Sequence, residues 1–172
     1  MPGDYQGQNR RDDRQPRGSQ SNFSQNPKRD WKAELATLQV GKDDKKRKLD
    51  EALVKEVIQQ GGKLLVETAE VFGRHLNKKE RKREDNLSTN QIRNVFGEVK
   101  RMEMGKFDPD KFVLLKPKLA YAAARANIDT ARQFAEVMTW AVTEVDDDAD
   151  KFARFVDFFE AILAYHKAAG GK

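Results

Sequence analysis

The sequence predicts an all-α protein, a compact bundle of about six helices that follows a disordered N-terminal tail. Two observations lead to this fold class. From Lys45 onward, apolar residues recur three and four positions apart, and no stretch alternates convincingly as a strand would. Residues 1–30, in contrast, contain few large apolar side chains and bury too little surface to offset their ordering entropy. We therefore expect residues 1–44 to be a disordered or weakly ordered polar tail and residues 45–172 to be the helical-bundle domain.

The first predicted helix has an apolar stripe that ends at a pair of glycines. Gly61 and Gly62 follow it directly, and a glycine in this place commonly caps a helix C-terminus. A second helix begins near Leu64 and becomes strongly basic in KKERKR, residues 78–83, a run typical of a mobile electrostatic contact. The stripe of the first helix consists of Leu49, Leu53, Val54, Val57 and Ile58.

A third helix is predicted after Ser88 or Thr89, either of which can cap a helix N-terminus. The helix is expected to end near Gly105. Its apolar face has the regular spacing of one side of a helix and comprises Ile92, Val95, Phe96, Val99 and Met102.

Two prolines organise the next segment. Asp108 before Pro109 is typical of a helix start, with the aspartate as cap and the proline in the first helical position. This fourth helix should be short, because Lys116 precedes Pro117 and is biased away from the helical region. Pro117 then becomes the expected first residue of a fifth helix that runs to about Ala126.

The last two predicted helices carry the widest apolar faces. The sixth covers about residues 128–145, and the final helix starts in DDDAD, residues 146–150, where negative charge suits the helix dipole. Gly170 and Gly171 close it. Its apolar face, which we expect to be core rather than a docking surface, comprises Phe152, Phe155, Val156, Phe159, Ile162 and Leu163.

Composition restricts the function classes only loosely. The net charge of +5 suggests a polyanionic partner, although many soluble proteins carry such an excess. The chain has no cysteine, and its polar N-terminus lacks the apolar region of a signal peptide. No apolar run approaches the length of a membrane span, about 20 residues. We expect a cytoplasmic protein without membrane contact.

Motifs for catalysis or metal binding are absent from the sequence. It contains no GxSxG, P-loop or GxGxxG motif, and DDDAD lacks the glycine and distal glutamate of a calcium loop. The two histidines, His75 and His166, are far apart, and His166 lies on the apolar line of the last helix, which favours a structural role. We expect no catalytic residue, no metal site and no cofactor, while a nuclease that uses either histidine stays an alternative.

Basic residues form a face on the third predicted helix, roughly opposite its apolar stripe. Arg93, Lys100 and Arg101 surround Gly97, which costs about 1 kcal/mol relative to alanine in a helix interior. Close approach of a phosphodiester backbone would explain the glycine. A solvated face with a tolerated glycine is the alternative.

A second basic group surrounds Pro117. If this proline starts a helix, Lys116 and Lys118 lie at its positive end, where their charge is unfavourable unless a phosphate binds there. Lys118, Tyr121 and Arg125 then follow one helix face and could contact an RNA backbone and stack on a base or sugar. Alternatively, Tyr121 belongs to the core and the charges only face solvent.

Charge is also distributed unevenly along the chain. Residues 144–160 carry seven acidic and two basic side chains, while residues 74–84 carry six basic and two acidic ones. Complementary patches of this kind could direct stacking of copies or docking to other subunits. A solvated charged surface is again the alternative.

Three segments, in this order, resemble one family. LSTNQIRNVFGEVKRM, LLKPKLAYAAAR and FVDFFEAILAYHKAAGG look like the small subunit of type III-A (Csm) CRISPR–Cas effector complexes, and the resemblance covers about residues 49–171. It implies a non-catalytic helical bundle that stacks in an inner filament and contacts the backbone of the guide–target RNA duplex without sequence specificity. The family's basic positions fall on Arg93, Lys116, Lys118 and Arg125.

The predicted RNA-binding set is therefore Arg93, Lys100, Arg101, Lys116, Lys118 and Arg125. The expected partners are guide RNA and target RNA, the backbone and large subunits of the effector complex, and further copies of the chain itself. A free-standing basic helical adaptor or nucleic-acid-binding protein is the alternative function.

Overall fold

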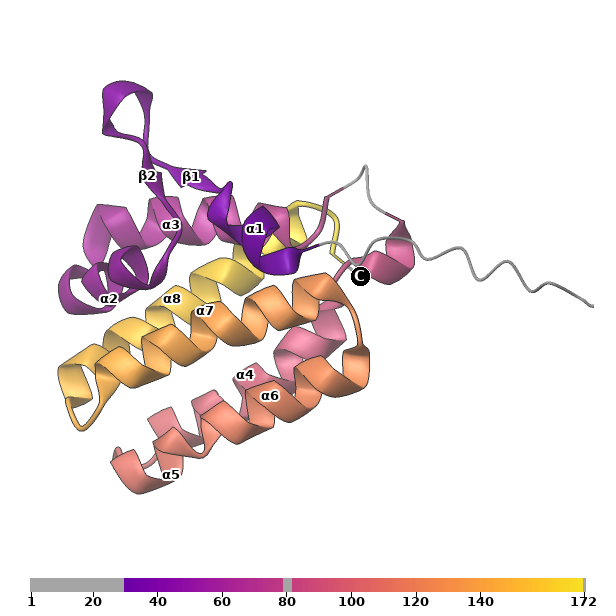
Figure 1. Ribbon diagram of the computed structural model, residues 1–172. Helices are drawn as coiled ribbons and strands as arrows, with labels where there is room; N and C mark the ends of the chain where they lie inside the picture. Colours follow the sequence, from indigo (N-terminus) through magenta and orange to yellow (C-terminus); the bar gives the residue numbers. More distant parts are fainter. Residues whose placement is uncertain (1–29, 79–81, 172) are drawn as a thin grey trace, which may run out of the picture.

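Helices α7 (Asp129–Val145) and α8 (Ala149–Ala168) lie at the centre of the computed structural model, which describes residues 30–78 and 82–171 (Figure 1). The other elements pack around this antiparallel pair, and the predicted all-α class is confirmed. The remaining helices are α1 (Trp31–Ala36), α2 (Glu51–Gln60), α3 (Gly62–His75), α4 (Thr89–Glu103), α5 (Pro109–Val113) and α6 (Leu115–Ala126). The short elements are β1 (Gln39–Val40), β2 (Arg47–Lys48) and the 3-10 turns η1 (Asp43–Lys45) and η2 (Arg83–Asp85).

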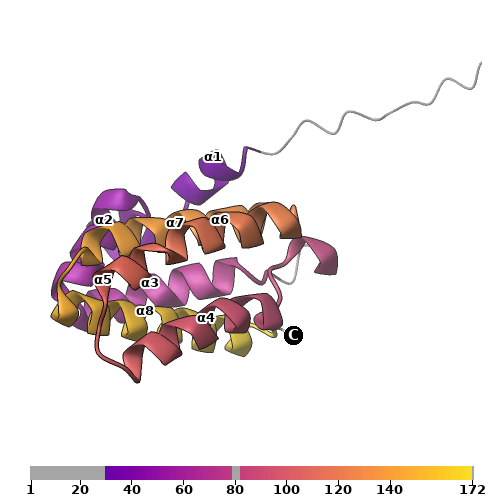
Figure 2. The ribbon, with the colours of Figure 1, turned by 90° about the horizontal axis from the view of Figure 1, so that it is seen from below.

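Each central helix collects its own neighbours. Helix α8 packs against α3 and α4, while α7 packs against α6, α2 and α1. Figure 2 shows this division, with α6 beside α7 and α4 beside α8. The apolar face of α8 is core, as expected, because Phe155, Phe159 and Ile162 are fully buried. Phe159 also meets Phe96 of α4 edge to face, with 5.1 Å between the ring centroids.

Acidic or hydroxyl side chains cap the N-termini of several of these helices. The Asp50 carboxylate accepts a hydrogen bond from Leu53 N, and Asp148 caps α8. Ser88, rather than Thr89, caps α4 in a reciprocal capping box with Gln91. Asp108 caps α5 with Pro109 in the first turn, which confirms that start. Such caps satisfy backbone N–H groups that have no partner inside the helix.

Glycine is required at two positions in or beside α3, at Gly61 for its backbone conformation and at Gly73 for close packing. Gly61 has φ of 64° and ends α2, which confirms the predicted cap. Gly73 lies where α3 crosses α8, and a Cβ added there would be 2.7 Å from the carbonyl oxygen of Ile162. The absence of a side chain at Gly73 therefore lets the two helix backbones approach closely.

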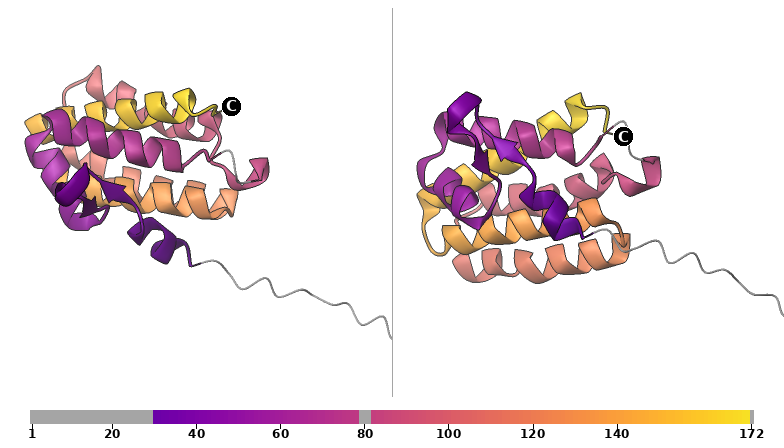
Figure 3. Two further views of the ribbon diagram at one scale, coloured as in Figure 1. Left: turned by 90° about the horizontal axis from the view of Figure 1, so that it is seen from above. Right: turned by 45° about the horizontal axis from the view of Figure 1, so that its top comes forward.

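The N-terminal boundary differs from the expected one at residue 45. Helix α1 and the β1–β2 hairpin pack onto the bundle, next to α7 and α3 respectively (Figure 3). Leu35, Leu38 and Val40 are buried in the common core. A helix of six residues and strands of two are too short to show a period, so the sequence does not reveal these elements. The part of the expected tail within residues 1–29 lies outside the described residues.

The expectation of no strand after Lys45 was also wrong. Arg47 and Lys48 pair antiparallel with Gln39 and Val40, opposite Val40 and Gln39 respectively. Both residues of β2 are exposed and basic, so the sequence offers no alternation of apolar and polar residues to reveal the strand.

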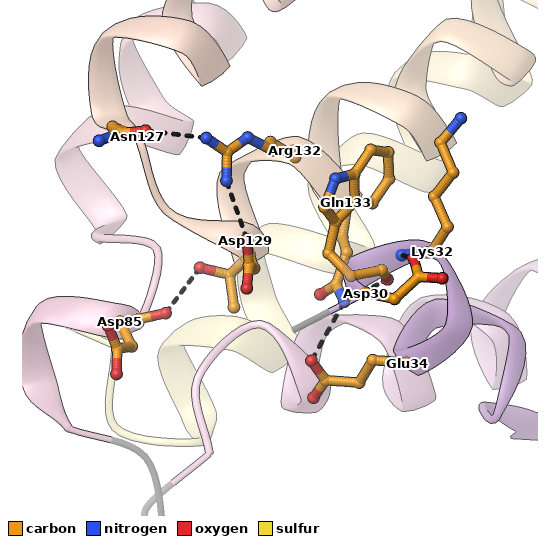
Figure 4. Close-up of polar contacts among 10 residues, drawn as sticks. Asp30, Lys32, Glu34, Asp85, Asn127, Asp129, Arg132 and Gln133 are labelled. Carbon is orange, nitrogen blue, oxygen red and sulfur yellow. Dashed lines mark hydrogen bonds and ion pairs between the residues drawn. The ribbon is translucent and has the colours of Figure 1, made fainter. Parts of the chain in front are cut away.

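A buried glutamine joins α1 to the central helix. Gln133 of α7 is fully buried, and its amide nitrogen donates to the carbonyl oxygen of Trp31 at 2.9 Å (Figure 4). Its amide oxygen accepts a hydrogen bond from His75 Nε2 at 2.8 Å. One side chain thus connects α1, α3 and α7 and satisfies polar groups that would be costly to bury alone.

The start of α6 differs from the sequence prediction. The helix begins at Leu115, so Lys116 is already helical and Pro117 occupies the third helical position rather than the first. The first turn of a helix tolerates proline because its N–H groups have no partner within the helix. Lys116 is thus helical despite the preference of a residue before proline for an extended backbone.

Candidate nucleic-acid interface

The six basic residues predicted to bind RNA lie on two helices. Helix α4 carries Arg93, Lys100 and Arg101, and helix α6 carries the others, Lys116, Lys118 and Arg125. Because α4 packs on α8 and α6 packs on α7, the two sets come from different layers of the bundle. The structure gives the six residues different surroundings.

Arg93 and Arg101 flank the open surface of α4 around Gly97. Both arginines are exposed, and an added Cβ at Gly97 would meet no atom within 4 Å. Arg101 Nε donates to the Gly97 carbonyl oxygen at 3.2 Å. Packing within the described chain therefore does not require a glycine at this position, and the surface around it is accessible.

Lys100 is already engaged with other groups. Its ammonium lies 2.7 Å from Glu103 and 3.6 Å from Glu160 of α8, and 5.5 Å from the centre of the Phe96 ring. The hydrogen bond to Glu103 raises the pKa of Lys100 above its usual value. An RNA phosphate would have to compete with two carboxylates for this side chain.

Helix α6 presents three of its side chains towards α4. Lys118 forms an ion pair with Glu98 of α4. Tyr121 is 68% exposed, so the alternative that it belongs to the core is wrong. Arg125 is exposed, one turn further on, and has no ion pair with any described residue. Lys118, Tyr121 and Arg125 therefore form one accessible row, with the spacing predicted from the sequence.

Lys116 does not join this row. Lys116 and Lys118 are two residues apart, and residues with this separation lie about 160° apart around a helix axis. Lys116 is half-buried on the other flank of α6, whereas Lys118 is exposed towards α4. The two lysines therefore face different sides, and the expected convergence of both on one phosphate at the helix start does not match their placement.

A groove runs between α4 and α6, and the sequence did not reveal it. Four hollows follow one another along α4, and neighbouring hollows share lining residues. The first and second share Gln91 and Ala126, the second and third share Tyr121, and the third and fourth share Glu98. The two central hollows have volumes of about 420 Å³ and about 450 Å³. Both helices line the two central hollows, and we call the row of four hollows the α4–α6 groove.

The groove exists because its two walls belong to different packing layers. Helix α4 is held by α8 and α6 by α7, and the facing side chains of α6 include the short Ala122, Ala123 and Ala126. Val95, Leu119 and Phe134 form an apolar floor. The sequence signal that could have shown the wall is the row Gln91, Asn94 and Glu98, polar residues at helical spacing beside the core stripe.

Both histidines are buried within the fold. His166 is fully buried, and its Nε2 donates to the carbonyl oxygen of Leu87 at 2.7 Å. Burial lowers the pKa of His166, because the charged imidazole is disfavoured away from water. His75, 2% exposed, donates to Gln133. These positions fit the structural role predicted for His166.

The described residues also bear on metal binding, membrane spanning and the basic segment 78–83. Within residues 30–78 and 82–171, no three His, Cys, Asp or Glu side chains are grouped so as to hold a metal ion. In the same part of the chain, no helix combines the length and apolar character needed to cross a bilayer. The basic segment 78–83 is only partly described, because residues 79–81 lie outside the described residues.

Opposite ends of the bundle carry different charges. The turn between α7 and α8 exposes Asp146 and Asp147, and Glu144 lies beside it in an ion pair with Lys151 at 2.8 Å. The other end contains η2, where Lys82 and Arg83 are exposed beside the acidic Glu84 and Asp85 (Figure 1). The acidic segment and the described part of the basic segment are thus far apart in space.

A comparison with protein families finds a match over residues 59–172 to the family described as Csm2 Type III-A. The match extends from the end of α2 through α8 and includes both walls of the α4–α6 groove. Neither the comparison with curated proteins nor that with solved structures finds a match.

Proposed function

Because the chain belongs to the Csm2 family, the small subunit of type III-A CRISPR effector complexes, we propose that it binds the backbone of the guide–target RNA duplex through the surface of α4 around Gly97. In this proposal, the subunit ignores base identity and catalyses no reaction. Copies of it stack in an inner filament along the duplex, next to the backbone and large subunits of the complex.

The observation that carries the proposal is the open surface around Gly97. Two exposed arginines, Arg93 and Arg101, project from a rigid helix whose glycine leaves space for a phosphate backbone. Contacts to phosphates give affinity without sequence information, because every nucleotide presents the same group. A subunit that serves any guide needs this kind of contact, since base pairing already supplies the specificity.

Basic and acidic side chains at the two ends of the bundle offer contacts for stacking of copies, although Glu84 and Asp85 also lie at the basic end. Asp146 and Asp147 at one end and Lys82 and Arg83 at the other can face each other when copies align head to tail. A contact of this type leaves free ends and can be repeated, unlike a closed two-fold dimer. Exposed ion pairs contribute only about 0–1 kcal/mol each, so the isolated protein is expected to be a monomer or weak dimer. Repeated copies on one duplex then add avidity.

The absence of catalysis is a proposal that the histidine environments support. A general base needs access to the proton that it removes, whereas His75 and His166 are buried and bonded to Gln133 and Leu87. We expect the purified protein to leave RNA and DNA uncut, with or without divalent metal ions.

A charge-reversal experiment tests duplex binding. The Arg93→Glu/Arg101→Glu variant should bind duplexes of unrelated sequence more weakly by a similar factor, with a flatter salt dependence. The Lys48→Glu/Lys63→Glu variant changes the net charge equally but lies on the hairpin and on α3, so its affinity should stay closer to that of the wild type. Equal losses for both variants, or no loss for either, would contradict the assignment to α4.

A further inference from the structure

The α4–α6 groove differs from the open surface around Gly97 in both shape and lining. The groove is hollowed between two helices, whereas a Cβ added at Gly97 would meet no atom within 4 Å. Helix α4 forms one wall from Gln91 to Met102, which corresponds to about 17 Å. The groove is therefore long enough to follow an extended chain rather than to enclose one small molecule.

The charge of the groove favours an anionic occupant. Six cationic side chains line it, against three carboxylates. Two of the carboxylates, Glu98 and Asp108, are already paired with groove lysines. The cations are Arg83, Arg101, Lys106, Lys111, Lys118 and Arg125.

An aromatic side chain lies at the middle of this channel. Tyr121 lines both central hollows and is 68% exposed, although a tyrosine next to an apolar floor could bury most of its surface. Asn94 lines the same two hollows from the opposite wall, so an amide group faces the same space. An exposed ring with a polar group beside it suits a flat, partly polar ligand such as a nucleobase.

A cationic channel with an aromatic platform is the combination that binds single strands. The cations follow the phosphates while the ring stacks on a base, and the contact tolerates any sequence because every base has a flat face. A duplex cannot use the platform in this way, because its bases are stacked inside the helix. The groove and the Gly97 surface thus suit different forms of RNA.

We propose that the α4–α6 groove binds a single-stranded segment of RNA, with one base stacked on Tyr121 and its neighbouring phosphates at Arg125 and Lys118. This inference rests on the proposed function in one respect, that the partner is RNA. It adds a second binding site for unpaired nucleotides, which adjoins the duplex surface at Arg101 and does not include Arg93.

The experiment compares Tyr121→Ala, Tyr121→Phe and Arg93→Glu in the full-length protein. Binding is measured for a short single-stranded RNA that contains 2-aminopurine and for a duplex of the same length. Tyr121→Ala should weaken single-strand binding about 5- to 100-fold and remove the quenching of 2-aminopurine, with duplex binding unchanged. Tyr121→Phe keeps the ring and should retain both signals. Thermal unfolding should be unchanged in both variants, since the side chain is exposed.

The outcomes separate this inference from the proposed duplex binding. If Tyr121→Ala leaves single-strand binding unchanged while Arg93→Glu weakens duplex binding, the groove inference alone fails. If Arg93→Glu has no effect on the duplex while Tyr121→Ala weakens the single strand, the duplex assignment alone fails. Loss of association with a protein subunit of the complex in Tyr121→Ala, with unchanged RNA binding, would assign the groove to a polypeptide and overturn the inference.

Discussion

Lys118 of α6 and Glu98 of α4 form an ion pair that crosses the α4–α6 groove. Both side chains line the hollow that also contains Pro117 and Tyr121. The pair links two helices that otherwise pack on different central helices, and it holds a lysine of the predicted RNA-binding set against a carboxylate. Its main effect is therefore on the affinity for an anion rather than on stability, because exposed pairs contribute about 0–1 kcal/mol.

Removal of this carboxylate should strengthen RNA binding. In Glu98→Gln, Lys118 becomes free to contact phosphate, so affinity at low salt should rise several-fold and the salt dependence should steepen by about one counterion. Fluorescence anisotropy at several salt concentrations measures both quantities. Glu51→Gln is the matched control, because it also removes a carboxylate from a lysine pair, that with Lys55, but lies on α2. Equal effects of the two substitutions would show that only the net charge matters.

Two glycine substitutions should change stability in opposite directions. Gly73→Ala should lower the free energy of unfolding by about 1–3 kcal/mol, because the new methyl group would lie 2.7 Å from the Ile162 carbonyl oxygen and 2.9 Å from Tyr165 Cβ. Gly97→Ala should raise it by up to about 1 kcal/mol, since nothing lies within 4 Å of the added Cβ and alanine favours the helix. Urea unfolding of both variants checks the pair.

The Gly97→Ala protein also provides a test of the surface of α4. If a phosphate backbone approaches this position, the stabilised variant should bind duplex RNA more weakly than the wild type. Unchanged duplex affinity would mean that the glycine is merely tolerated.

The buried His166 should make the protein less stable in mild acid. Burial lowers its pKa in the folded state, while the unfolded chain has a value near 6.5. Below that pH the unfolded state binds more protons than the folded state. The contribution of His166 to the free energy of unfolding is therefore fully present above about pH 6.5 and decreases as the pH falls towards the folded pKa. Denaturant unfolding across this range measures the slope. His166→Gln removes the titrating group, and a slope identical to that of the wild type would contradict the assignment.

The segment before residue 45 should contribute to stability. Leu35→Ala is expected to cost about 2–5 kcal/mol, since Leu35 is 3% exposed and packs in the common core. Val66→Ala removes apolar atoms from a side chain that is 45% exposed and should change stability by less than about 0.5 kcal/mol. A shortened chain that starts at Lys45 should likewise unfold at lower denaturant concentration than one that starts at Asp30. Equal stability of these two chains would place residues 30–44 outside the folded domain.

Features set by local chemistry were predictable from the sequence. The caps at Ser88 and Asp108 and the glycine stop at Gly61 act through the adjacent backbone, so the structure confirms them. The wide apolar face of α8 is likewise a property of one helix and is confirmed as core. These signals need no knowledge of what lies on the other side of the helix.

Features that depend on relations between distant segments were not predictable. The α4–α6 groove arises from the choice of α8 and α7 as packing partners, which periodicity does not specify. The pairing of Lys118 with Glu98 and the burial of Gln133 between α1 and α3 have the same origin. The expected convergence of Lys116 and Lys118 on one phosphate was wrong because α6 starts at Leu115. Lys116 is therefore helical, and two residues along a helix separate it from Lys118 onto the other flank.

The central position of α7 and α8 has a consequence for the synthesis of the protein. These two helices follow α2, α3, α4 and α6 in the chain, yet all four pack against one or both of them. The earlier helices are therefore synthesised before their packing partners, and their apolar faces have no native partner during that interval. The bundle can close only after α8 has been made, and until then these faces favour aggregation of the nascent chain.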